Sequence, residues 1–210
     1  MHLTRADIQA EERIKRLNII NSISGIKPAN LVGTIDGKGQ TNLAIFSSAF
    51  HLGSNPALVG MILRPDHEVR RHTWENIKET GYYTLNHVHE SFIQQAHYTS
   101  AKFEKEESEF AGVGLTEQYV EGFVAPLVAE SKVKMGLKFE QSVPIEMNGT
   151  IMIIGSVEHL LIPDDAVDER GHLDLSQLGG VGISGLNSYY KLEKMAKFPY
   201  ARKSELPDFS

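Results

Sequence analysis

Short apolar runs separated by turn residues dominate the first third of the chain. Residues 31–35 (LVGTI) are rich in β-forming side chains, and the four residues after them, DGKG, signal a tight turn. A second strand-like run over residues 41–50 follows this turn. Two such runs around a glycine-containing turn predict a β-hairpin.

The same pattern continues along the rest of the chain. Further strands are predicted over residues 57–63, 82–88, 133–139 and 150–162, with the Asn148-Gly149 turn before the last of them. About six short strands result, and they do not alternate regularly with helices. This order argues against a doubly wound parallel sheet and predicts a mainly β protein, either a barrel or a sandwich.

Helix signals are confined to the margins of this pattern. Thr4 can cap a largely exposed helix within residues 1–20, because Asp7 stands three positions later. Apolar residues at a spacing near four predict a second helix over residues 66–80, and Gly81 stands just past its end. The helices are therefore expected at the periphery of the β structure.

The remaining segments are assigned from their composition. Residues 91–100 are expected to be helical, and the acidic run over residues 104–109 is expected to be a solvated surface. Residues 180–210, rich in glycine, aromatics and lysine, are expected to form a C-terminal extension. At 210 residues, the chain fits a single domain over residues 1–210.

Composition excludes several kinds of protein. The chain has no cysteine, which rules out disulfides, thiolate metal sites and thiol catalysis, so a redox role needs a bound cofactor. A formal net charge of −6 argues against nucleic acid as a partner. No apolar run approaches the roughly 18–20 residues that span a bilayer, and no secretory signal opens the chain. We therefore expect a cytoplasmic protein with no membrane partner.

Two patterns resemble known sites and fail on closer reading. Residues 33–38 imitate a phosphate-binding loop, but the glycine spacing is one short and Gly39 stands where Ser or Thr should hold magnesium. His87 and His89 share one face of a predicted strand, but no third ligand follows at a suitable spacing. No metal site is predicted, and a barrel with metal at these two histidines stays only an alternative.

One constellation suits a phosphate monoester, which needs hydroxyls, amides and cations to replace its water. These groups are supplied by Ser47, Ser48, Arg64, Thr73 and one of Arg70 and Arg71. A hydrogen bond to a charged group contributes roughly 1.5–3 kcal/mol, so several together suffice for a tightly held nucleotide. Serines in a strand and arginines in a helix are also common on plain surfaces, and spacing alone leaves both interpretations open.

The order of segments resembles that of the flavin-reductase-like, FMN-binding split-barrel family. The resemblance covers about residues 16–190. It is carried by KPANLVGTIDGKGQTNLAIFSSAF, SNPALVGMILRP, RHTWENIKETGYYTLNHV, AHYTSAKF, SEFAGVGL, APLVAESKV and TIMIIGSVEHL. The pieces RHTWENIKETG and AHYTSAKF are the most distinctive. Ala57 departs from the family, which commonly has a second proline at this position.

This resemblance implies a fold, a cofactor and a reaction. The fold is a six-stranded Greek-key split β-barrel with peripheral helices, assembled as a homodimer with FMN near the subunit interface. The reaction is hydride transfer from NAD(P)H to flavin N5, with no catalytic side chain. The implied cofactor-binding residues are Asn42, Phe46, Ser47, Ser48, Arg64, Thr73, Asn76, Thr99 and Ser100.

Two other functions stay open. In the first, the chain binds FMN as an electron carrier or sensor that does not use nicotinamide. The second is the flavin-free barrel with metal at the histidine pair. The adjacent Tyr189 and Tyr190 are interpreted either as a shield over the flavin or as packing residues. The resemblance implies no particular electron acceptor, no choice between NADH and NADPH, and no choice between prosthetic and exchanging flavin.

Overall fold

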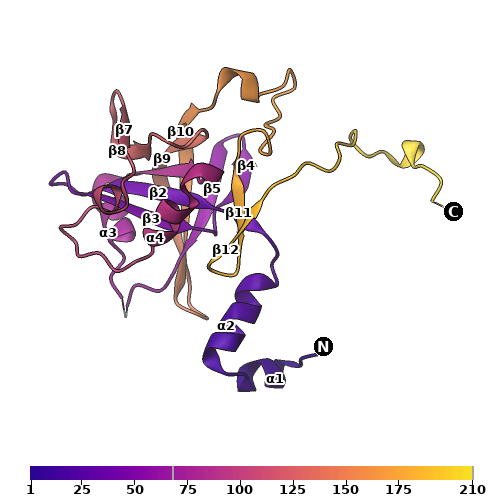
Figure 1. The fold of residues 1–210 in the computed structure, drawn as a ribbon, viewed down its shortest axis with the longest axis horizontal. Coiled ribbons are helices and arrows are strands. Elements are labelled where there is room, and N and C mark those ends of the chain that lie inside the picture. Colours follow the sequence, from indigo (N-terminus) through magenta and orange to yellow (C-terminus); the bar gives the residue numbers. More distant parts are fainter. Residues whose placement is uncertain (68, 210) are drawn as a thin grey trace.

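A curved seven-stranded sheet forms the centre of the computed structural model, which describes residues 1–67 and 69–209 (Figure 1). Neighbouring strands are antiparallel throughout. In spatial order they are β3 (Thr41–Phe46), β2 (Asn30–Ile35), β6 (Tyr82–His87), β9 (Lys134–Ile145), β10 (Thr150–Leu161), β5 (Ala57–Leu63) and β4 (Phe50–Ser54).

The sheet closes because its two edge strands are consecutive in the chain. β3 and β4 lie at opposite edges, yet only Ser47, Ser48 and Ala49 separate them. Such a link spans roughly 14 Å at most, so the two edges must approach each other. The predicted single strand over residues 41–50 is therefore wrong. It breaks at this link because Phe50 pairs with Gly60 of β5, across the sheet from β2. We call residues 47–49 the seam.

Two smaller sheets complete the β structure. β7 (Glu117–Val120) and β8 (Phe123–Val128) form a hairpin, and β1 (Lys27–Pro28), β11 (Val181–Ser184) and β12 (Ser188–Lys191) form a three-stranded side sheet. Six strands were predicted, so the count is too low, although the mainly β class is right. The missed strands are β1, β7, β8, β11 and β12, and all but β8 have only two to four residues.

The core has two parts, one on each face of the sheet. Val32, Leu85 and Leu137 belong to the cluster enclosed by the barrel, while the neighbouring Leu31 belongs to a second cluster outside it. Adjacent residues of a strand point to opposite faces, which explains this division. Helices cover both faces of β2 and β3: α3 (His72–Thr80) on the barrel side, and α4 (Ile93–Tyr98) and α5 (Glu109–Val113) on the outer side.

The helix α3 (His72–Thr80) packs on the barrel side through Trp74 and Ile77. It ends as predicted at Gly81, whose φ of 78° is the left-handed conformation that glycine adopts readily. It begins at His72, six residues later than predicted, so the predicted start at residue 66 is wrong. Residues 66, 67 and 69–71 are not helical, and residue 68 of the predicted helix lies outside the described residues. Pro65 favours extended backbone in the residue before it, at the end of β5.

The outer face carries the other helices of the body. These are η1 (Glu90–Phe92), α4 (Ile93–Tyr98) and α5 (Glu109–Val113). Ala96 of α4 and Phe110 of α5 pack against Leu31 and Leu43. The predicted helix over residues 91–100 is thus present as two short pieces.

One surface prediction fails on this face. Glu109 belongs to the acidic run that was predicted to be solvated, but it is buried, and its Oε2 accepts a hydrogen bond from the backbone N of Leu43 (2.8 Å). Leu43 lies in the edge strand β3, where outward amides have no strand partner. The carboxylate supplies one, which explains its burial.

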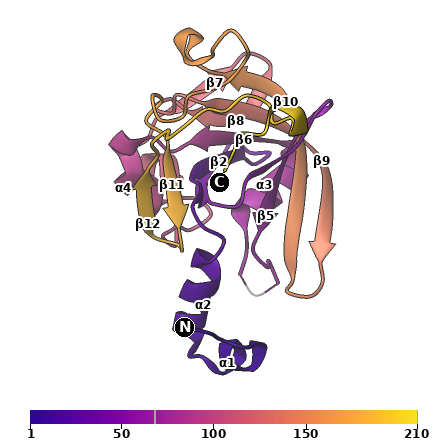
Figure 2. The ribbon, with the colours of Figure 1, turned by 90° about the vertical axis from the view of Figure 1, so that its right-hand side faces the viewer.

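The two chain ends project from the body (Figures 1 and 2). The predicted capping box of Thr4 and Asp7 is confirmed at α1 (Arg5–Ala10), but the predicted single helix is wrong. A second helix, α2 (Arg13–Ser22), starts anew because the Glu12 side chain caps it. At the other end, the extension begins only after Lys191, because residues 181–191 belong to the side sheet.

Two short 3-10 turns lie outside these elements, at η2 (Asp164–Ala166) and η3 (Lys203–Glu205). Across the described parts of the chain, no helix combines the length and apolar character that crossing a lipid bilayer demands.

Candidate functional site

Three of the predicted site residues meet where α3 lies on the sheet. Asn42 Nδ2 donates to Thr73 Oγ1 (3.1 Å), and Asn76 Nδ2 donates to Thr34 Oγ1 (3.1 Å). Thr34 and Asn42 are themselves directly opposite on β2 and β3. All four side chains are buried. This network fixes the first two turns of α3 against the edge of the sheet.

The start of α3 has the properties of an anion site. No side chain caps this helix, and within the described residues the backbone N–H groups of His72 and Thr73 have no hydrogen-bond acceptor. Unpaired N–H groups and the helix dipole favour a negative charge at this position. The nine-residue helix therefore presents unsatisfied donors next to the hydroxyl of Thr73.

Cations gather at the same helix end. Arg71 is half-buried, its Nε donates to the carbonyl of Pro65 (3.1 Å), and burial together with the nearby Arg64 lowers its pKa. The charge of Asp66 opposes this shift. Among residues 1–67 and 69–209, no carboxylate lies within ion-pair distance of either guanidinium. Two neighbouring cations without such a partner favour an anionic ligand.

Arg70 differs from Arg71 although the two are adjacent. Its Nε and Nη2 donate to the two carboxylate oxygens of Glu75 at 2.8 and 2.7 Å. This bidentate pair with Glu75 of α3 neutralises the charge of Arg70, which lies just before the helix. The sequence left open which of the two arginines serves the predicted phosphate site, and the geometry favours Arg71.

The seam places the next predicted residues beside the free edge of β3. Ser48 Oγ donates to the carbonyl of Ile62 (2.8 Å) and accepts from the N–H of Ile62 (3.2 Å). Ser48 therefore ties the seam to β5. Phe46 packs partly against the barrel core, and the half-buried Ser47 has no hydrogen-bond partner among the described residues. Ser47, and not Ser48, has a hydroxyl available to a ligand.

Part of the β3 edge is also open. The Leu43 amide points away from β2, to Glu109, and alternate residues of an antiparallel edge strand direct their backbone groups the same way. The backbone groups of Ile45 therefore face outward as well, next to Phe46 and Ser47. An edge of this kind can hydrogen-bond a flat, polar ring.

Thr99 and Ser100 lie at the end of α4, on the other face of the sheet. Thr99 Oγ1 donates to the carbonyl of Ala96 (2.8 Å), and Ser100 Oγ donates to that of His97 (2.7 Å). Both hydroxyls thus bond to their own helix. The structure brings Asn42, Thr73 and Asn76 together, and it leaves Thr99 and Ser100 apart from them.

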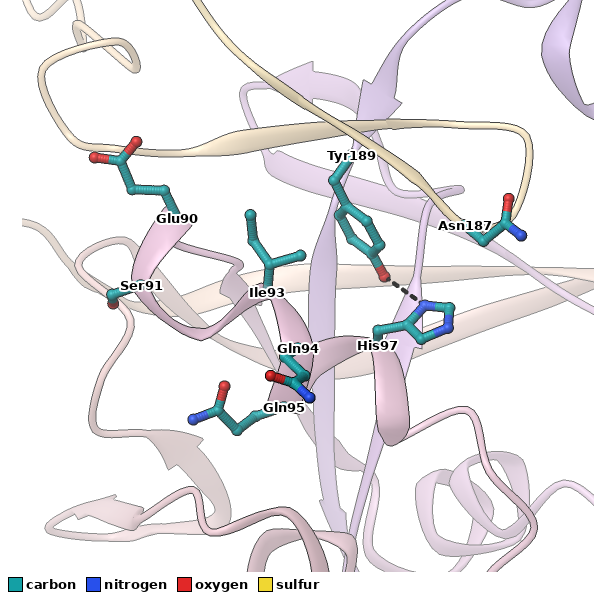
Figure 3. Close-up of a pocket in the computed structure, with 8 residues that line it drawn as sticks. All are labelled: Glu90, Ser91, Ile93, Gln94, Gln95, His97, Asn187 and Tyr189. Atoms are coloured by element: carbon teal, nitrogen blue, oxygen red, sulfur yellow. Dashed lines mark hydrogen bonds between the residues drawn. The ribbon is translucent and has the colours of Figure 1, made fainter.

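A surface pocket adjoins α4 (Figure 3). It has a volume of about 620 Å³ and is lined by Glu90, Ser91, Ile93, Gln94, Gln95, His97, Asn187 and Tyr189. His97 Nδ1 and the Tyr189 hydroxyl share a hydrogen bond of 3.1 Å, and burial raises the pKa of Tyr189 to about 12. Tyr189 also packs against the outer core cluster, while Tyr190 is exposed. The sequence did not predict this pocket, because its lining combines α4 with β12, and His97 and Tyr189 are 92 residues apart in the chain.

The two histidines of the predicted pair have different surroundings. His89 accepts a hydrogen bond from the N–H of Ser91 and caps η1, while burial lowers the pKa of the half-buried His87. Throughout the described ranges, no three potential ligands gather.

The chain is similar to a described protein family and to individual relatives. The family model described as "Flavin reductase like domain" matches residues 26–177. An uncharacterized protein of Halalkalibacterium halodurans is 30% identical over 171 residues, which make up 79% of this chain and 81% of the relative.

Solved structures share the fold. A split barrel domain protein from Shewanella frigidimarina NCIMB 400, assigned to the flavin reductases, is 48% identical, with a TM-score of 0.92 over 96% of this chain and all of that one. Flavoredoxin of Desulfovibrio vulgaris is 23% identical, with a TM-score of 0.70 over 86% of this chain and 92% of its own. The predicted fold class, a mainly β split barrel with peripheral helices, is confirmed.

Proposed function

The chain belongs to the flavin reductase like domain family, and from this premise we propose that it is an FMN-dependent oxidoreductase, an NAD(P)H:flavin reductase acting as a homodimer. Membership of this family supports a flavin-related oxidoreductase. The observation that carries the FMN part of the proposal is the start of α3, where uncapped backbone N–H groups adjoin Arg64 and Arg71, which form no ion pair within residues 1–67 and 69–209.

The FMN phosphate fits this helix end. It carries between one and two negative charges near neutral pH and several acceptor oxygens, which match the N–H groups of His72 and Thr73. Arg64 and Arg71 supply the balancing charge. Asn42 orients the Thr73 hydroxyl, and Asn76 holds the helix against Thr34. In this proposal, Asn42 and Asn76 act on the cofactor site by positioning α3.

The flavin ring would then lie along the free edge of β3. Phe46 and the hydroxyl of Ser47 flank it, and the outward backbone groups of Ile45 meet its polar edge, while Ser48 keeps the seam closed. Thr99 and Ser100, at the end of α4 on the outer face, stay a prediction for this site. When bound, FMN supplies a ring nitrogen, N5, that accepts hydride from nicotinamide. The protein binds, orients and excludes water, so no acid or base is assigned.

The first test is the visible spectrum of the purified protein, taken without oxygen before and after NADH or NADPH is added. A flavin spectrum that bleaches with either nucleotide supports the reductase. A spectrum that persists with both contradicts the reductase and favours an FMN-binding electron carrier. Absence of a flavin band after incubation with FMN would overturn the proposal altogether.

A second measurement tests the phosphate assignment. The protein should bind FMN at least about tenfold more tightly than riboflavin, because riboflavin lacks the group that meets α3. Quenching of flavin fluorescence gives both dissociation constants. Equal affinities would contradict a phosphate site at this helix.

A further inference from the structure

The last residues of the chain expose large apolar side chains. Beyond β12, residues 192–209 run outward from the body (Figure 1). The largest apolar side chains of this arm, Phe198, Tyr200, Leu206 and Phe209, are between 63% and 85% exposed. Apolar groups gathered on one exposed segment usually mark an interaction site. We call residues 192–209 the C-terminal arm.

The base of the arm is held in a defined direction. Lys194 Nζ pairs with Asp174 (2.9 Å), and Lys197 Nζ pairs with Asp168 (2.7 Å). The Ser176 hydroxyl and Lys194 lower the pKa of Asp174 to about 2, and Lys197 above all lowers that of Asp168. Exposed pairs of this kind contribute little to stability. They do set the course of the arm as far as Lys197, beyond which its aromatic residues begin.

Both projecting ends leave the body at the same small sheet. The N-terminal helices lead into β1, the arm follows β12, and β11 lies between these strands. A Cβ on Gly182 of β11 would collide with Ile26 and touch Leu192, so the glycine lets the two ends meet there. The N-terminal segment also exposes Ile14 and Ile23. The apolar surfaces of both ends thus arise at one place.

We propose that residues 198–209 bind the body of a second copy of this chain, so that two subunits exchange their C-terminal arms. The inference rests on the proposed homodimer and assigns a segment to its interface. Each arm carries three aromatic side chains, which bury about 150–250 Å² apiece. Two arms together then bury roughly 1,000 Å² of side chain alone, a large share of a standard interface of about 1,600 Å².

Charge does not oppose a second copy as the partner. Residues 198–209 carry two cationic and two acidic side chains, so the segment has no formal net charge, while the whole chain has a formal net charge of −6. A neutral, aromatic segment can therefore approach the body of an identical, acidic subunit without net repulsion. The segment contains Pro199, which suits an extended arm and not a helix.

Sedimentation velocity of the FMN-loaded protein tests the exchange. The full chain should be dimeric at micromolar concentration. Truncation after Lys197, or the double substitution Phe198→Ser and Tyr200→Ser, should weaken dimerisation at least about tenfold. Met147→Ser is the matched control, because Met147 is 98% exposed on the β9–β10 turn, and it should leave the dimer unchanged. Equal dimerisation of the truncated and full chains would overturn the exchange.

Cross-linking identifies the chain that the arm contacts. The protein has no cysteine, so Ala201→Cys carries a single benzophenone label between the aromatic residues of the arm. Irradiation should give a species of twice the chain mass. A label at Met147→Cys should not give this species. Products confined to one chain, or equal cross-linking from both positions, would contradict the proposal.

The outcomes separate this inference from the function it rests on. A dimer that survives truncation removes the arm and leaves the homodimer. A full chain that is monomeric at every concentration overturns both the arm exchange and the homodimer. The flavin spectrum of the same samples reports FMN binding independently, so loss of that spectrum would count against the cofactor and not against the arm.

Discussion

The helices α3 and α4 lie against opposite faces of the same two strands, yet they are held in different ways. α3 is fixed by side-chain hydrogen bonds that reach Thr34 and Asn42 on the strands, and its first N–H groups are left open. α4 is held by apolar packing, and the hydroxyls at its end bond to their own helix. Both segments were predicted to bind the cofactor, and both helices begin without a side-chain cap. They differ because α3 begins beside the cations Arg64 and Arg71, whereas the predicted hydroxyls of Thr99 and Ser100 already donate to carbonyls of their own helix.

The largest expected effect comes from the cations at α3. Arg71→Gln should weaken FMN binding roughly 10- to 100-fold, because one charge-assisted contact to the phosphate is lost, and it should leave riboflavin binding nearly unchanged. Fluorescence titration with both flavins measures this. The matched control is the double variant Arg70→Gln/Glu75→Gln, which removes a neutralised pair and should change FMN affinity less than threefold. A comparable loss in the control would contradict a special role for Arg71.

The second effect concerns stability. Asn76→Ala should lower the free energy of unfolding by about 1–3 kcal/mol, because it leaves the buried Thr34 hydroxyl without its partner. Thr99→Val, which keeps the side-chain volume and removes only a bond within α4, should cost less than about 1 kcal/mol. Urea unfolding of the FMN-free proteins gives both values. The comparison between the two helices breaks down if Thr99→Val proves the more damaging.

A smaller effect is expected at the outer face, where burial raises the pKa of Glu109 against the opposing hydrogen bond from Leu43. Because the folded pKa lies above the unfolded one, the folded state binds more protons, and this group lowers stability as pH rises above about 4.5. Glu109→Gln should therefore be more stable than the natural protein at pH 7, by less than about 1 kcal/mol. That advantage should vanish near pH 4.5. Urea midpoints at both pH values test this, and a less stable variant at pH 7 would contradict it.

The smallest effect is expected at the pocket beside α4. Tyr189→Phe keeps the ring in the outer core cluster and removes only the hydrogen bond to His97. If Tyr189 serves packing, FMN affinity should change by less than about twofold. A loss of tenfold or more would instead place this pocket in the cofactor site, and α4 would then resemble α3 in function. Fluorescence titration distinguishes the two results.

Local patterns predicted several elements closely. The run over residues 57–63 matches β5, because a short apolar segment bounded by prolines has few other conformations. Gly81 ends α3 and Thr4 caps α1, since both depend only on neighbouring residues. The residues of the proposed phosphate site could also be named from the sequence, because arginine, serine and threonine cluster within about 30 residues.

Other features depend on distant partners and could not be predicted locally. The strands β1 and β11 pair Lys27 with Ile183, more than 150 residues apart, and two- or four-residue strands have no periodicity to detect. Glu109 looks like part of a solvated acidic run, and only its contact with the free amide of Leu43 explains its burial. Neither Arg70 nor Arg71 can be preferred until Glu75 is seen to neutralise one of them.

The sequence by itself therefore determined the mainly β class, the family and the principal strands, because each follows from local propensity or from the order of segments. Only the tertiary structure decided which polar groups remain available. It shows that Ser48 closes the seam, that Thr99 and Ser100 bond to their own helix, and that α3 begins uncapped. The reason is physical: a side chain's hydrogen-bonding capacity is finite, and folding determines which partners reach it first.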